Sequence, residues 1–253
     1  MLSGNRGADA GVSTDMKQEF RPSLPWFLAF LCACFVLSEL HEQVHIQTGY
    51  LLYSGYGPRD FNLWQTARSD GYRWIATLAG PLFSFACMWT GLWISRRRPG
   101  PGIALLFAAL PFARLLTALM GGGDEKVVLL ALSGNETLGP ALRVILATVV
   151  LLCAGLPVLL ATCRFRLRAP MVVLLLVLPL LIEYPLTHTL YNRLLHQGFG
   201  ARVFFGGTPW LIQLHFVGMA SLLWLLRRQL FLSHPQTDQA PKREGRPQAT
   251  LTP

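Results

Sequence analysis

The chain has 253 residues, of which 52% are hydrophobic and only 14% carry a charged side chain. Soluble domains carry about 25% charged residues, so this composition excludes an ordinary soluble protein and indicates a membrane protein. The net charge of +9 would also suit a nucleic-acid-binding protein. However, the basic residues lie in short clusters between apolar runs, without a basic–aromatic motif. We therefore expect no nucleic acid partner.

Six apolar runs of about 20 residues predict an all-α fold, a polytopic bundle of transmembrane helices in contact with the lipid bilayer. The predicted spans are 24–47, 73–95, 101–120, 141–163, 169–190 and 209–228. Together they form one membrane domain over residues 23–232. Residues 1–22 and 233–253 are polar segments, for which we expect disorder.

Lys and Arg residues are distributed unevenly among the segments that connect these spans. They are concentrated near both termini and in two short loops, 96–98 and 164–168, that contain three arginines each. An excess of basic residues marks the cytoplasmic side of a membrane protein. Both termini are therefore predicted to be cytoplasmic, and the protein is predicted to lie in the cell (inner) membrane.

The first span ends in the sequence His41-Glu42-Gln43-Val44-His45, an HExxH motif. On a helix, positions i and i+4 share a face, so both imidazoles can bind one metal ion. The glutamate between them can reach a water on that metal and act as a general base. We therefore predict a zinc site near the non-cytoplasmic face, with His41 and His45 as ligands and Glu42 as the catalytic residue.

A catalytic zinc ion needs a third protein ligand. Asp124 and Glu125 are two candidates, because they follow three glycines just past the outer end of the third span. Glycine lets a backbone turn sharply and approach another element closely. Asp124 is preferred narrowly, and Glu125 stays as the alternative.

Glu183 and His188, near the outer end of the fifth span, are the other candidates for the third ligand. Pro185 lies between them and should kink the helix. Both residues can reach the site, either as ligands or in support of it. Arg114 in the third span needs a partner inside the membrane, and Glu183 is a natural one.

These motifs resemble those of the site-2 protease family of intramembrane zinc metalloproteases. That family combines an HExxH helix with a Gly-Pro motif on a neighbouring helix and an aspartate on a later one. The resemblance runs from the first span to the loop after the third. It implies that Asp124 is the third ligand and that Gly80, Pro81 and Ser84 lie beside the bound substrate. Two positions differ: Ser84 stands where the family usually has Asn, and Glu125 follows Asp124 where it usually has Gly.

The resulting hypothesis is a membrane-embedded zinc metalloprotease that hydrolyses peptide bonds of membrane proteins or peptides. The alternative is a transporter or a metal-binding membrane scaffold without enzymatic activity, because six spans with a broken helix also suit a polar transport path. The loop over residues 49–72 is rich in aromatic residues. It is predicted to be either an interfacial belt or a lid that controls access to the metal.

Overall fold

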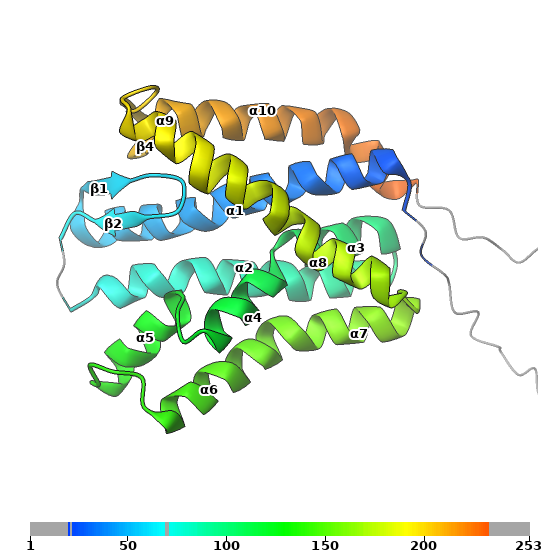
Figure 1. The fold of residues 1–253 in the computed structure, drawn as a ribbon, viewed down its shortest axis with the longest axis horizontal. Helices are drawn as coiled ribbons and strands as arrows, with labels where there is room; N and C mark the ends of the chain where they lie inside the picture. Colours follow the sequence, from blue (N-terminus) through cyan, green and yellow to red (C-terminus); the bar gives the residue numbers. More distant parts are fainter. Residues whose placement is uncertain (1–19, 21, 69–70, 233–253) are drawn as a thin grey trace, which may run out of the picture.

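The computed structural model describes residues 20, 22–68 and 71–232 and is a bundle of long helices (Figure 1). Six helical segments are long and apolar enough to cross a membrane. They are Leu24–Tyr53, Arg73–Ser95, Pro99–Leu119, Pro140–Phe165, Ala169–His196 and Trp210–Phe231. The predicted all-α, six-span bundle is thereby confirmed, and the chain is a multi-pass membrane protein.

The predicted disorder of residues 1–22 and 233–253 falls almost entirely outside the described residues. Phe20 is an exception, because it is buried and packs edge-on against Trp26. Burying an apolar ring against the first helix is more favourable in free energy than leaving it exposed to water. At this residue the prediction of disorder is wrong.

The first helix, α1 (Leu24–Tyr53), begins at Ser23, whose hydroxyl oxygen accepts a hydrogen bond from the backbone N–H of Trp26. It ends at Ser54, which adopts the left-handed conformation. The helix is longer than the predicted span 24–47, so the HExxH motif lies two turns inside its end and not at the end itself. The second helix, α2 (Arg73–Ser95), matches its predicted span.

The third predicted span consists of two helices, α3 (Pro99–Ala108) and α4 (Pro111–Leu119). Leu110 between them has a φ of 55°. Proline disfavours the α conformation in the residue before it, which accounts for a break at this position. The break gives α4 its own direction. A further helix, α5 (Asp124–Ser133), follows and was not predicted from the sequence.

The remaining spans contain π-helical or 3-10 segments. They consist of α6 (Pro140–Val150), η1 (Leu151–Gly155) and α7 (Leu156–Phe165), then α8 (Ala169–Glu183), η2 (Tyr184–Tyr191) and α9 (Asn192–His196), then α10 (Trp210–Leu226) and η3 (Arg227–Phe231). The kink predicted at Pro185 takes the form of the π-helical segment η2. Proline lacks the N–H that would continue the α-helical pattern, so the local hydrogen bonding must shift.

Two short antiparallel hairpins complete the described structure, and neither was predicted from the sequence. One pairs β1 (Tyr56–Arg59) with β2 (Trp64–Thr66), and the other pairs β3 (Val203–Phe205) with β4 (Thr208–Pro209). The β1–β2 hairpin lies beside the C-terminal part of α1 (Figure 1). Within the predicted loop 49–72, residues 49–53 belong to α1, and residues 56–66 form an ordered hairpin at the HExxH end of the bundle.

The helix α1 occupies the middle of the bundle, between α2 and α10 (Figure 1). Its N-terminal half packs into a core that contains the fully buried side chains of Trp26, Phe30 and Phe107. Its C-terminal half carries the polar residues of the HExxH motif. The apolar core therefore holds the N-terminal half of α1 in place. The C-terminal half presents polar side chains to the neighbouring elements.

Candidate metal centre

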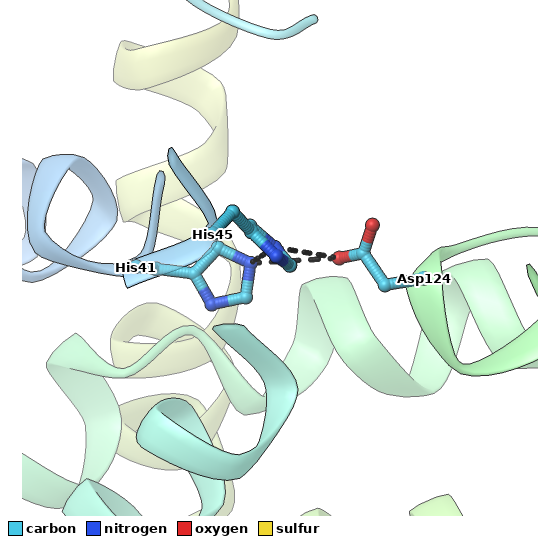
Figure 2. Close-up of side chains that lie close together, drawn as sticks. All are labelled: His41, His45 and Asp124. Atoms are coloured by element: carbon cyan, nitrogen blue, oxygen red, sulfur yellow. Dashed lines mark hydrogen bonds and ion pairs between the residues drawn. The ribbon is translucent and has the colours of Figure 1, made fainter. Parts of the chain in front are cut away.

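The two histidines of the HExxH motif and Asp124 converge on one point, although they come from α1 and from the start of α5 (Figure 2). The His41 Nε2 and His45 Nε2 atoms lie 3.0 Å apart. Asp124 Oδ2 lies 3.5 Å from His41 Nε2 and 3.4 Å from His45 Nε2. The sequence left four candidates for a third ligand, and the structure brings Asp124 to the histidines.

These separations suit a tetrahedral metal ion. With metal–ligand bonds of about 2.0–2.1 Å, neighbouring ligand atoms in a tetrahedron lie about 3.4 Å apart. Both distances from Asp124 agree with this value, and the His41–His45 distance is slightly shorter. Two imidazoles and one carboxylate leave the fourth position of the tetrahedron for water or substrate. The three side chains therefore fit an open, catalytic type of metal site.

Both imidazole rings are oriented by hydrogen bonds at their outer nitrogen atoms. His45 Nδ1 donates to the backbone carbonyl of Ala76 over 2.7 Å. His41 Nδ1 lies 2.9 Å from the hydroxyl oxygen of Ser84. A proton on each Nδ1 leaves the Nε2 lone pair directed at the metal position. Ser84, predicted to contact substrate, therefore has a structural role in holding His41, and its contact with substrate stays a prediction.

Gly80 lies directly against both rings. A Cβ atom at this position would lie 2.2 Å from His45 Nε2 and 2.7 Å from His41 Cε1. Ala76, Gly80 and Ser84 are four residues apart, so they form one stripe of α2 that faces the histidines. Because Gly80 lies in the middle of this stripe, any side chain at this position would overlap the imidazole rings. This packing does not test the predicted contact of Gly80 and Pro81 with substrate, which stays a prediction.

Asp124 reaches the histidines because the chain turns tightly between α4 and α5. Gly121 and Gly123 have φ values of 67° and 84°, which residues with a Cβ rarely adopt. A Cβ at Gly123 would also crowd Thr117 and Glu125. The turn makes Asp124 the first residue of α5 and directs its carboxylate at α1.

Arg114, on α4, contacts two of the candidate metal ligands, Asp124 and His41. One of its guanidinium nitrogens lies 2.9 Å from Asp124 Oδ2 and another 2.8 Å from His41 Nε2. Glu125 Oε1 lies 3.6 Å from the first of these nitrogens. The lone pairs of His41 and Asp124 are thus already directed at a cation. The pairing of Arg114 with Glu183 predicted from the sequence is wrong, because α4 turns the guanidinium towards α5.

The surroundings distinguish Asp124 from Glu125. Burial alone would raise the pKa of Asp124, but hydrogen bonds to His41 and His45 and the Arg114 charge outweigh it and hold that pKa well below its ordinary value. Burial raises the pKa of Glu125, although Arg114 opposes the shift. A carboxyl group must be ionised to bind a metal ion. The electrostatics therefore favour Asp124 as the ligand and leave Glu125 as a neighbour of Arg114.

Glu42 lies between the two histidines on α1, and its carboxyl group interacts electrostatically with His45, Arg59 and Arg114. No hydrogen bond engages this carboxyl group within the described part of the chain. It is only partly buried, whereas both histidines are buried. Glu42 thus lies near His45, Arg59 and Arg114 without a hydrogen-bond partner among the described residues.

The β1–β2 hairpin covers the histidines. The Trp64 ring stacks on the His45 ring, with 4.6 Å between the centroids and 18° between the planes. Arg59 pairs with the buried Glu39 of α1 through two hydrogen bonds of 2.9 and 3.0 Å. The backbone N–H of Phe61 donates to Asn192 at the start of α9. The hairpin is therefore attached at both sides, and its role in controlling access stays a prediction.

Glu183 and His188 lie outside the group of His41, His45 and Asp124 in the described structure, so neither candidate takes the place of the third ligand, and a supporting role for them stays a prediction. Both line a separate cavity between α4 and the α8–η2 segment. The fifth span carries them to this cavity, whose opposite wall is formed by Phe112 and Leu116 of α4. Glu183 instead lies close to Ser38 on α1.

Several of these contacts have no signal in the sequence pattern. The acceptor for His45 is a backbone carbonyl, which every residue possesses. Trp64 was one of several aromatic residues in its loop, and only the hairpin register selects it. The Arg59–Glu39 pair joins residues from two different elements, and Glu39 was visible only as one more ionisable residue in a membrane helix.

Comparisons with family models, with curated proteins and with solved structures gave no match.

Proposed function

We propose that this protein is a membrane-embedded zinc metalloprotease that hydrolyses peptide bonds of membrane proteins or peptides. The observation that carries the proposal is the convergence of His41, His45 and Asp124 at tetrahedral spacing, with Glu42 beside them. Two imidazoles and a carboxylate are a common ligand set of catalytic zinc. The resemblance of the HExxH and Gly-Pro motifs to site-2 proteases points to the same chemistry.

A zinc ion held by these ligands would supply a Lewis acid that activates water and polarises a peptide carbonyl. Glu42 would accept a proton from the attacking water and return it to the leaving amine. Ser84 and the Ala76 carbonyl hold the imidazoles in one orientation throughout. Trp64, stacked on His45, would limit the access of bulk water from the hairpin side.

The position of the motif along α1 supports a site near one membrane face. At a rise of about 1.5 Å per residue, His41 and His45 lie roughly 26 and 32 Å from the start of the helix. This distance is close to the thickness of the hydrocarbon layer, about 30 Å. With cytoplasmic termini in a cell (inner) membrane, the site would lie near the non-cytoplasmic face. Labelling of a cysteine introduced at Glu136 with an impermeant reagent in intact cells tests this orientation.

The decisive experiment compares wild type with Glu42→Gln in lipid nanodiscs. Zinc is measured by elemental analysis, and cleavage is followed with labelled single-span peptides that contain a central Gly-Pro. We expect one zinc ion in both proteins and a loss of cleavage of about 10²–10⁴-fold in the variant. Glu136→Gln, in an exposed loop, is the matched control and should cleave normally. Full activity of zinc-loaded Glu42→Gln would refute the proposal.

A metal transporter or metal-binding scaffold is the second candidate. The broken helices α3–α4 and α8–η2 favour it, because transporters build ion sites from interrupted helices. The same Glu42→Gln variant separates the two candidates. In proteoliposomes a transporter would move zinc at a rate that depends on His41 and not on Glu42, and it would cleave no peptide.

A further inference from the structure

A cavity of about 420 Å³ lies in the wall of the bundle, between α4 and the α8–η2 segment. Its walls are almost entirely apolar, with Phe112 and Leu116 on one side and Leu180 and Leu181 on the other. Leu116 and Leu181 are also among the exposed apolar residues. In a membrane-spanning bundle, such a cleft opens towards lipid and not towards water.

One polar side chain stands out in this apolar cleft. Glu183 is only 5% exposed, and its Oε2 atom has no hydrogen-bond partner within the described residues. A buried polar atom without a partner is costly, particularly at membrane depth. A ligand that fills the cleft and offers a hydrogen-bond donor would remove this cost.

The backbone around Glu183 is also irregular. The π-helical segment η2 begins at the next residue, Tyr184, and contains Pro185. A second proline, Pro179, lies one turn earlier in α8. π-Helical turns occur frequently at functional sites. The wall of the cleft is therefore a distorted stretch of helix that carries its unpaired carboxyl group inwards.

The cleft is adjacent to the metal centre, and α4 forms the partition between them. Phe112 lines the cleft, whereas Ala113 and Arg114 line a small cavity beside His41. Glu183 lines the cleft, and the nearby Ser38, one turn before His41 on α1, lines the small cavity. A molecule held in the cleft is thus one helix diameter or less from the metal ligands.

We propose that this cleft binds an unwound stretch of a membrane-embedded polypeptide and that Glu183 accepts a hydrogen bond from a backbone N–H of that stretch. Lipid acyl chains fill apolar space but carry no N–H donor. An intact helix uses its N–H groups internally, apart from those of its first turn. An unwound polypeptide offers both apolar side chains and free backbone N–H groups at this depth. The inference rests on the proposed function, since the bound stretch would be the substrate.

The test uses a photoreactive benzoylphenylalanine at position 181 in the Glu42→Gln background, in nanodiscs. The probe is a biotinylated single-span peptide with a central Gly-Pro. The matched control carries the photoreactive group at Leu214 on α10, which is similarly exposed. We expect peptide crosslinking at position 181 to exceed that at position 214 by at least tenfold. Equal crosslinking at both positions, or crosslinks to phospholipid only, would overturn the proposal.

The hydrogen bond is tested with a series of peptides in which one backbone N–H of the central stretch is replaced by an ester oxygen. One replacement should weaken crosslinking about tenfold with Glu183 present and have no effect in Glu183→Leu. Glu183→Gln, which keeps an acceptor oxygen, should behave within threefold of Glu183. Zinc content and gel filtration report whether Glu183→Leu folds. If this variant does not fold, the test rests on crosslinking of the ester-containing peptides to the protein that retains Glu183. If no ester replacement weakens that crosslinking, the proposed hydrogen bond is refuted.

The two proposals fail separately. Crosslinking requires no cleavage, so peptide bound at position 181 by a protein that never cleaves would refute the protease function alone. Cleavage by wild type with no crosslink at position 181 would refute the cleft alone.

Discussion

Gly80→Ala tests the geometry of the metal centre most directly. The new Cβ would lie 2.2 Å from His45 Nε2, the atom that would bind the metal. To restore an ordinary contact of 3.4 Å, the ring or the helix α2 must move by about 1.2 Å. Metal sites tolerate deviations of about 0.2 Å in ligand distance. The displacement is several times larger, so we expect zinc affinity to fall by at least about 100-fold.

The same substitution has a cost for folding that must be separated from metal binding. Overpacking a helix interface lowers the free energy of unfolding by about 1–3 kcal/mol. Gly91→Ala is the matched control, because its Cβ would lie 2.5 Å from the Leu106 backbone nitrogen, in the α2–α3 interface. It should show a similar loss of stability and normal zinc binding.

Zinc affinity is measured by competition with a chelating dye in nanodiscs, and stability by thermal unfolding with zinc removed. The reasoning predicts loss of zinc only in Gly80→Ala. Unchanged zinc affinity in Gly80→Ala would refute the close packing of Gly80 on the histidines. Equal loss of zinc in Gly91→Ala would show that helix packing in general, and not ring contact, controls the site.

Three further predictions concern charged residues of the site. Asp124→Asn should lower zinc affinity about 100-fold or more, whereas Glu125→Gln should retain zinc, as measured by elemental analysis after dialysis. Arg114→Met should lower the free energy of unfolding of the metal-free protein by about 3–5 kcal/mol, because it leaves buried carboxylates unpaired, and added zinc should recover part of this loss in a denaturation assay. Arg59→Met should destabilise by a similar amount, and replacing its partner as well, in Arg59→Met/Glu39→Leu, should recover stability; an additive loss in the double variant would contradict the pairing.

The sequence predicted the local features of the site because they depend on helix periodicity alone. His41 and His45 are four residues apart, so any helix places them on one face. The spans followed from the length of the apolar runs. Asp124 and Glu125 could not be separated in this way, since adjacent helical residues point about 100° apart and either could face α1. The φ values of Gly121 and Gly123 determine which one does.

Contacts between distant elements could not be predicted from the sequence, because they depend on the relative directions of separate helices. Arg114 had several acidic residues within plausible reach, and the break at Leu110 decided that α4 directs it to Asp124 and away from Glu183. Ser84 showed only as a departure from a family motif, and its contact with His41 depends on how α1 crosses α2.

The residue pattern alone was thus enough to predict a six-span membrane protein with two histidines that can bind one metal ion. Those features depend on composition and on spacing within one helix. Helix packing was needed to bring Asp124 to the histidines, to place the groups that orient the rings, and to leave Glu183 Oε2 in a lateral cleft without a partner among the described residues. Each of these is set by the relative position of separate helices, which is fixed by packing at glycines and prolines and has no counterpart in local periodicity.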